Sequence, residues 1–217
     1  MLVRDVMETK LCTISPETTL PEALRLVAQR GIRHLPVVED AKLVGIVSDR
    51  DLKRAMASPA TSLEAHELMY LLDRLRVREI MTRAVIVIGP TCPVEEAARL
   101  MVQDKIGALP VTDGDQLVGI VTETDVLELF VKAMGAGEPS SRLDVILGDR
   151  PSAMAAATRA LEHAGVTISS IVTLRTRGVR EAVIRIATID PGPAVGALRA
   201  QGFVIRDGER PRGGSHP

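Results

Sequence analysis

The stretch that decides the fold is LVGIVSDRD at residues 43–51, because it occurs a second time as LVGIVTETD at residues 117–125. The repetition extends well beyond this stretch. Residues 3–52 align without a gap to residues 77–126 at a constant offset of 74, and 20 of these 50 positions are identical. A duplication of this kind predicts two small units related by a pseudo-twofold axis. A cleft between two such units is a natural place for a ligand.

Composition excludes several classes of protein. A chain of 217 residues suits two modest domains, and its 27 basic and 28 acidic residues nearly cancel, so no strong field favours nucleic acid or an anionic membrane. One Tyr, two Phe and no Trp leave no platform for stacking bases. No apolar run approaches the roughly 20 residues of a membrane span, and the amino terminus lacks the apolar region of a signal peptide. We expect a cytoplasmic protein with no nucleic-acid and no membrane partner.

The reactive side chains are scattered. The two cysteines, Cys12 and Cys92, do not occupy equivalent positions in the repeats, so we expect buried, reduced thiols. The four histidines lie in different segments, and no nucleophile–base set or metal-ligand cluster is visible. The sequence therefore predicts no catalytic residue, no metal, no obligatory cofactor and no enzymatic activity.

Each repeat is predicted to fold as β-α-β-β-α. A short opening ends in Met (residues 3–7 and 77–81), and a short strand follows (residues 11–14 and 85–88). An apolar stripe at i, i+3, i+4 and i+7 predicts a helix from residue 20 and its counterpart from residue 94. Thr19-x-x-Glu22 predicts a capping box at the start of the first. Two strands with a tight connection come next, and a second helix begins at residue 49 or 123.

The carboxy-terminal third has a different rhythm. Strand patterns at residues 143–147, from 166 and at 181–189, together with helices ending near 164 and 201 and a last strand at 203–205, give the order β-α-β-β-α-β. That order is the ferredoxin-like, split-βαβ arrangement. The fold class is thus α/β (α+β), with predicted boundaries at residues 1–57 (repeat 1), 58–76 (helical linker), 77–134 (repeat 2), 135–141 (linker), 142–207 (third domain) and 208–217 (disordered tail).

The end of the repeated stretch carries the candidate binding chemistry. Ser48 closes a strand and Asp51 opens a helix, whose N-terminus offers free N–H groups and a partial positive charge. The Asp51 carboxylate can accept hydrogen bonds from both ribose hydroxyls, and Arg50 can pair with phosphate. Adenine needs only an apolar slot and backbone hydrogen bonds. Thr122 and Asp125 repeat the pattern. The alternative is purely structural, since Ser-x-x-Asp before a helix is also a capping signal.

The two copies differ in charge. Arg33, His34 and Arg50 are replaced by Gly107, Ala108 and Thr124 in the second repeat. An Arg-His pair with Arg50 nearby can clamp a phosphate. The alternative is that His34 is an ordinary, partly buried histidine beside a strand. The sequence leaves open which cleft Arg33 and His34 face. The candidate ligand-binding residues are Arg33, His34, Pro36, Ser48, Arg50, Asp51, Pro110, Thr122 and Asp125.

Residues 1 to about 135 resemble a tandem CBS-domain pair, a Bateman module, through Leu-Pro-Val and Gly-Ile-Val-[Ser/Thr]-x-x-Asp in both repeats. The resemblance implies an adenosine-containing ligand such as AMP, ADP, ATP, S-adenosylmethionine or NAD, with AMP, ADP or ATP favoured. It also implies roles for Ser48, Asp51, Thr122 and Asp125 and a homodimer that signals to a separate, unknown partner.

The remainder resembles an ACT domain, and the order of domains is similar to AcuB-type acetoin-utilization proteins. Ser152 and Thr167 stand where ACT domains often have Gly and Asn, which weakens an amino-acid site. Two alternatives to nucleotide sensing stay open at this point. One is an interaction subunit with empty clefts, and the other is an amino-acid sensor that works through the ACT-like domain.

Overall fold

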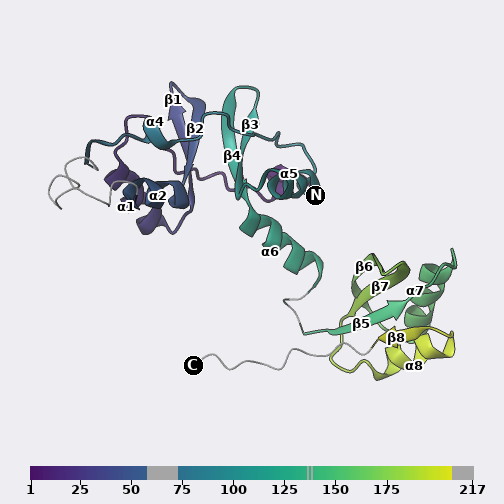
Figure 1. The fold of residues 1–217 in the computed structure, drawn as a ribbon. Helices are drawn as coiled ribbons and strands as arrows, with labels where there is room; N and C mark the ends of the chain where they lie inside the picture. Colours follow the sequence, from purple (N-terminus) through teal and green to yellow (C-terminus); the bar gives the residue numbers. More distant parts are fainter. Residues whose placement is uncertain (58–72, 136, 138, 207–217) are drawn as a thin grey trace, which may run out of the picture. The chain divides into compact units, whose positions relative to one another are not determined.

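The computed structural model describes residues 1–57, 73–135, 137 and 139–206, and it divides into two compact units, Met1–Leu127 and Glu128–Pro217 (Figure 1). Most of the predicted helical linker at 58–76 and all of the predicted tail at 208–217 lie outside the described residues. No helix in the described part of the chain is long and apolar enough to cross a membrane.

The first unit contains one four-stranded sheet in the order β1-β2-β4-β3. Each repeat supplies an antiparallel hairpin with the same register, in which Leu35 pairs with Val47 and Leu109 with Val121. The hairpins meet where Lys42 pairs with Gln116. The elements are η1 (Val3–Asp5), α1 (Leu20–Arg30), β1 (His34–Glu39), β2 (Lys42–Ser48), α2 (Asp49–Ala57), α4 (Val77–Ile80), α5 (Val94–Asp104), β3 (Ala108–Asp113) and β4 (Gln116–Thr122). Helix α6 (Glu123–Ala133) begins in this unit and continues past its last residue, Leu127.

The opening segments of the two repeats are exchanged. Val3 is fully buried in the core of the second repeat, and Val77 is fully buried in the core of the first. The backbone bonds mirror each other, since Val3 N donates to Cys92 O and Val77 N donates to Thr18 O, both at 2.9 Å. The sequence repeat is therefore not the packing unit, because each opening packs into the core of the other repeat.

The strands predicted at residues 11–14 and 85–88 are wrong in extent. Each is reduced to a single parallel bridge, Ile14 to Val37 and Ile88 to Val111. The cause is the exchange of openings. Because Glu8 bridges to Ile120 in the other repeat, the chain from residue 8 to residue 14 must cross between repeats and cannot follow β1.

Methionine–glycine contacts fix the exchanged openings. A Cβ on Gly45 would lie 2.5 Å from Met81 Sδ and 3.2 Å from Thr82 O, and a Cβ on Gly119 would lie 2.5 Å from Met7 Sδ. Real Cβ atoms do not approach a sulfur atom this closely, so a side chain at either glycine would force the methionine to shift from its place over the strand. Repetition of Met and Gly in both repeats thus has a packing explanation.

The predicted capping box at the start of α1 is confirmed. Thr19 N donates to Glu22 Oε2 at 2.8 Å, and Glu22 N donates to Thr19 Oγ1 at 3.3 Å. This reciprocal pair satisfies two N–H groups that the first turn of a helix leaves without a partner.

The second unit has the predicted order β-α-β-β-α-β. Its elements are β5 (Ser141–Ile146), α7 (Ala153–His163), β6 (Ile168–Thr176), β7 (Val179–Ile186), α8 (Gly192–Ala200) and β8 (Val204–Arg206). The sheet is antiparallel in the order β6-β7-β5-β8. Buried alanines of α7 share one core cluster with Ile184 of β7 and with Phe203, which directly precedes β8. The strand predicted to reach residue 189 ends at Ile186, because Thr188 turns the chain by accepting from Asp190 N.

We predict that Gly45→Ala destabilises the first unit by about 1–3 kcal/mol, the usual cost of an overpacked core. The added methyl group collides with Met81 and with the Thr82 carbonyl. Chemical denaturation of the full chain measures the loss, and the double variant Gly45→Ala/Met81→Ala should recover part of it. An additive double variant would show that the methionine contact is not the constraint.

Candidate functional site

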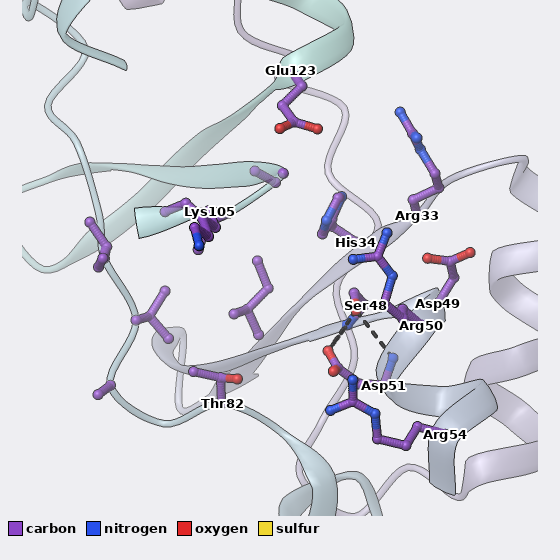
Figure 2. Close-up of a pocket in the computed structure, with 17 residues that line it drawn as sticks. Arg33, His34, Ser48, Asp49, Arg50, Asp51, Arg54, Thr82, Lys105 and Glu123 are labelled. Carbon is purple, nitrogen blue, oxygen red and sulfur yellow. Dashed lines mark hydrogen bonds between the residues drawn. The ribbon is translucent and has the colours of Figure 1, made fainter. Parts of the chain in front are cut away.

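A cavity of about 480 Å³ lies where the two repeats meet (Figure 2). Its walls are the β2–α2 junction at residues 48–54, the segment 82–86 after α4, the connection 105–108 between α5 and β3, and Arg33 with His34 just before and at the start of β1. Segment 82–86 reaches this place because the second repeat's opening packs against the first repeat, where Thr82 pairs with Ile46. The cavity is therefore built by both repeats.

Ser48 and Asp51 form a cap at the start of α2. Ser48 Oγ donates to Asp51 Oδ2 at 2.6 Å, Ser48 N donates to the same oxygen at 3.0 Å, and Asp51 N donates to Ser48 Oγ at 3.2 Å. The Ser-x-x-Asp motif therefore does cap the helix, as the structural interpretation of the sequence predicted. It leaves Oδ1 of Asp51 without a hydrogen-bond partner among the described residues, so capping and ligand binding are compatible at this carboxylate.

The second repeat has the same cap. Thr122 Oγ1 and Thr122 N both donate to Asp125 Oδ2 at 2.7 Å. Neither Thr122 nor Asp125 lines the cavity. They occupy the equivalent position in the second repeat, and a ligand role for them stays a prediction.

Pro36 and Pro110 also lie outside the lining of the cavity. Both are buried in strands, β1 and β3, where their carbonyls accept from Ile14 N and Ile88 N at 3.1 Å. The structure therefore gives both residues a place in the backbone pairing of the sheet, and contact with a ligand stays a prediction.

Four cationic side chains surround the cavity: Arg33, Arg50, Arg54 and Lys105. Arg33 Nη2 donates to Thr124 Oγ1 at 2.8 Å, so this side chain lines the cavity and also reaches the second motif. Arg33 and His34 both line the cavity that contains Ser48 and Asp51, and their contact with a ligand stays a prediction. Arg50, Arg54 and Lys105 form no hydrogen bond or ion pair within the described part of the chain. The carboxylates of Asp49, Asp51 and Glu123 line the same cavity, so its four cationic side chains exceed its acidic ones by one. This positive excess, together with the three unpaired cations, favours an anionic ligand.

Another part of the lining is apolar and comes mainly from Ile46, Ile106 and residues 84–86. Thr82 pairs with Ile46, but the segment beyond it joins no strand. The main-chain N–H and C=O of Ile86 have no hydrogen-bond partner among the residues that are described. An apolar wall beside unpaired backbone groups can hold a flat heterocycle and read its edge.

His34 lies where the two repeats approach each other. A Cβ on Gly107 would lie 3.1 Å from His34 Cε1 and 3.4 Å from Glu123 Oε2, so the glycine makes room for the imidazole. Burial lowers the pKa of His34, and the charge of Arg33 lowers the pKa further, while Asp49 and Glu123 oppose the shift. His34 therefore favours its neutral form when the cavity is empty.

Sequence reasoning missed several cavity residues: Arg54, Thr82, Ala84, Val85, Ile86, Lys105 and Glu123. Arg54 carried a usable signal, since it follows Arg50 by one helical turn. The others carried no such signal, because their place in the cavity depends on the exchange of openings and on how the two repeats pack together.

No group of three or more His, Cys, Asp or Glu side chains in the described residues can hold a metal ion, and Cys12 and Cys92 are free.

We predict that His34→Gln flattens the pH dependence of stability. Because the pKa of His34 is lowered below its ordinary 6.5 in the folded state, the unfolded chain binds the proton first as pH falls. The free energy of unfolding of the parent protein should therefore decrease as pH drops below about 6.5, and less so in the variant. Denaturation curves between pH 5 and 8 measure the difference. Parallel profiles for the two proteins would contradict the burial of a neutral imidazole.

Comparison with known proteins supports the duplicated architecture. The family model for the CBS domain matches residues 3–58 and 77–132. A CBS domain-containing protein from Dictyostelium discoideum is 38% identical over 143 residues, covering 65% of this chain and 99% of the relative. Other relatives carry the match as a segment of an enzyme: it spans 24% of a homoserine O-acetyltransferase from Methanohalobium evestigatum, at 36% identity and over 59% of this chain.

Solved structures show the same arrangement. A CBS domain pair in complex with 5′-methylthioadenosine and S-adenosyl-L-methionine has a TM-score of 0.53 and 31% identity, covering 61% of this chain and 97% of that one. CBSX2 in complex with AMP has a TM-score of 0.51 and 31% identity, covering 60% and 96%. A protein assigned to acetoin utilization (AcuB) from Vibrio cholerae has a TM-score of 0.53 and 33% identity, covering 64% and 98%. With two matched domains that share one sheet, the chain belongs to the CBS-domain family, as a tandem pair followed by a separate α+β unit.

Proposed function

We propose that this protein is a regulatory sensor that binds an adenosine-containing ligand in the cavity between its CBS repeats. The observation that carries the proposal is the unengaged Oδ1 of Asp51 at the edge of a cavity that has both an apolar wall and free cations. Related pairs solved with AMP, or with 5′-methylthioadenosine and S-adenosyl-L-methionine, support an adenosyl ligand.

The parts of the ligand match the parts of the cavity. The ribose hydroxyls donate to Asp51, whose other oxygen keeps the cap on α2. The base lies against Ile46 and residues 84–86, where the unpaired main chain of Ile86 recognises its edge. This arrangement requires no aromatic side chain, which agrees with a chain that has three aromatic residues in all.

Regulation follows from the composition of the walls. A ligand in this cavity contacts residues 48–54 of the first repeat and residues 82–86 of the second, so its binding favours one arrangement of the repeats over others. A homodimer transmits this preference to a separate partner. The signalling role agrees with the relatives in which the CBS pair makes up nearly the whole protein.

We also infer that the second unit is an ACT-type domain with a mainly structural role. The supporting observations are its β-α-β-β-α-β order and its antiparallel strand order β6-β7-β5-β8. Ser152 occupies the N-cap position of α7, but its side chain forms no capping hydrogen bond. No observation in the described residues favours an amino-acid site over this reading.

We predict that Asp51→Asn weakens the binding of ADP tenfold or more, because hydrogen bonds to a charged group contribute about 1.5–3 kcal/mol each. The amide keeps one acceptor oxygen and loses the charge. Calorimetric titration of the purified full chain measures the dissociation constants for AMP, ADP, ATP, S-adenosylmethionine and NAD in parallel.

Asp125→Asn is the matched control, since Asp125 caps α6 as Asp51 caps α2 but lies outside the cavity. It should leave the affinity of the cavity unchanged. A drop in stoichiometry with Asp125→Asn would instead reveal a second binding position in the other repeat. Absence of binding by every ligand would favour an interaction subunit with empty clefts.

A further inference from the structure

Lys105 has an unfavourable backbone conformation at the edge of the cavity. It ends α5 with φ 55° and ψ 44°, in the left-handed region. The first repeat has Gly31 at the equivalent position, with φ 62° and ψ 26°. A side chain in this conformation costs roughly 1 kcal/mol relative to glycine. The other non-glycine residues with positive φ in the described chain, Asp40, Ala41 and Arg177, lie in hairpin turns, so Lys105 is the one that ends a helix.

The side chain of Lys105 lines the cavity from the second repeat, across from Ser48, Arg50 and Asp51 (Figure 2). It forms no ion pair or hydrogen bond with any described residue, so no polar contact of the side chain offsets the backbone cost. Arg50 and Arg54 approach the same space from α2, also without counter-ions. A group held between these side chains would have positive charge on both sides, although Asp49, Asp51 and Glu123 also line the cavity. Sites that retain backbone strain are often functional, because a side chain is needed at that point.

We infer that Lys105 is a specificity-determining residue that makes the cavity select a phosphate-bearing adenosyl ligand over an uncharged nucleoside or a cationic sulfonium. This inference rests on the proposed function, since it assumes that the ribose and base occupy the cavity. The ammonium group of Lys105 contacts the phosphate chain from the second repeat, while the guanidinium groups of Arg50 and Arg54 contact it from the first. The phosphate therefore links the two repeats. An S-adenosylmethionine sulfonium at the same place is repelled by all three cations.

The test compares adenosine, ADP and S-adenosylmethionine by calorimetric titration of the full chain. The parent protein should bind ADP more tightly than the other two, with an affinity for ADP that falls as salt is raised. Lys105→Gly should weaken ADP about tenfold, a typical loss for one charge-assisted contact, and leave adenosine unchanged. Its midpoint of thermal unfolding should not decrease, because glycine relieves the left-handed strain. Loss of binding is thus separated from loss of folding.

Two variants control for the backbone and for the charge. Lys105→Arg keeps the charge and the strain, so ADP should still be preferred over adenosine. Gly31→Lys places the same side chain at the equivalent position of the first repeat, which does not line the cavity. That variant should lower thermal stability and leave the preference for ADP unchanged.

The outcomes separate the two hypotheses. If the parent binds both adenosine and ADP and the ratio of their affinities is the same in Lys105→Gly, the role of Lys105 is overturned and the proposed function stands. If S-adenosylmethionine binds the parent more tightly than ADP, the preference for phosphate is overturned, again without loss of the sensor. If none of the three ligands binds the parent, both the proposed function and this inference fail.

Discussion

The exchange of opening segments is the interaction on which the rest of the first unit depends. Val3 and Val77 are fully buried in the core of the opposite repeat, and Met7 and Met81 cover Gly119 and Gly45 there. Neither opening can leave without exposing apolar surface in the other repeat. The repeats therefore form one packed unit, and the segment that follows the second opening is held beside the first repeat, where it becomes a wall of the cavity.

A single carboxylate joins the fold to the candidate site. Asp51 uses Oδ2 to cap α2 through Ser48, and this fixes the position of Oδ1 at the edge of the cavity. A group that is already held by its own backbone loses little conformational freedom when a ligand binds. Capping and binding are thus two consequences of one geometry, and the same cap at Thr122 and Asp125 makes Asp125 the natural reference for measuring the ligand contribution.

Duplication supplied a symmetric scaffold, and the chemical differences lie in a few positions near its axis. In the alignment of the repeats, Arg50 corresponds to Thr124, Arg33 to Gly107, and Lys105 to Gly31. In the structure, Arg33, Arg50 and Lys105 line one cavity, whereas Gly107 makes room in it for His34. The two repeats therefore share their backbone and core, but they contribute charge unequally.

The sequence by itself determined the local structure: the capping box at Thr19, the two hairpins, the duplicated Ser-x-x-Asp and Thr-x-x-Asp caps, and the β-α-β-β-α-β order of the second unit. Periodicity and capping are readable because they involve residues within a few positions of one another. Only the tertiary structure decided which repeat each opening covers, why the strands before Ile14 and Ile88 shrink to one bridge, and how Lys105 and Ile86 reach the cavity. Each opening shows the same apolar pattern whichever core it enters, so the choice depends on burial between segments that are far apart in the chain.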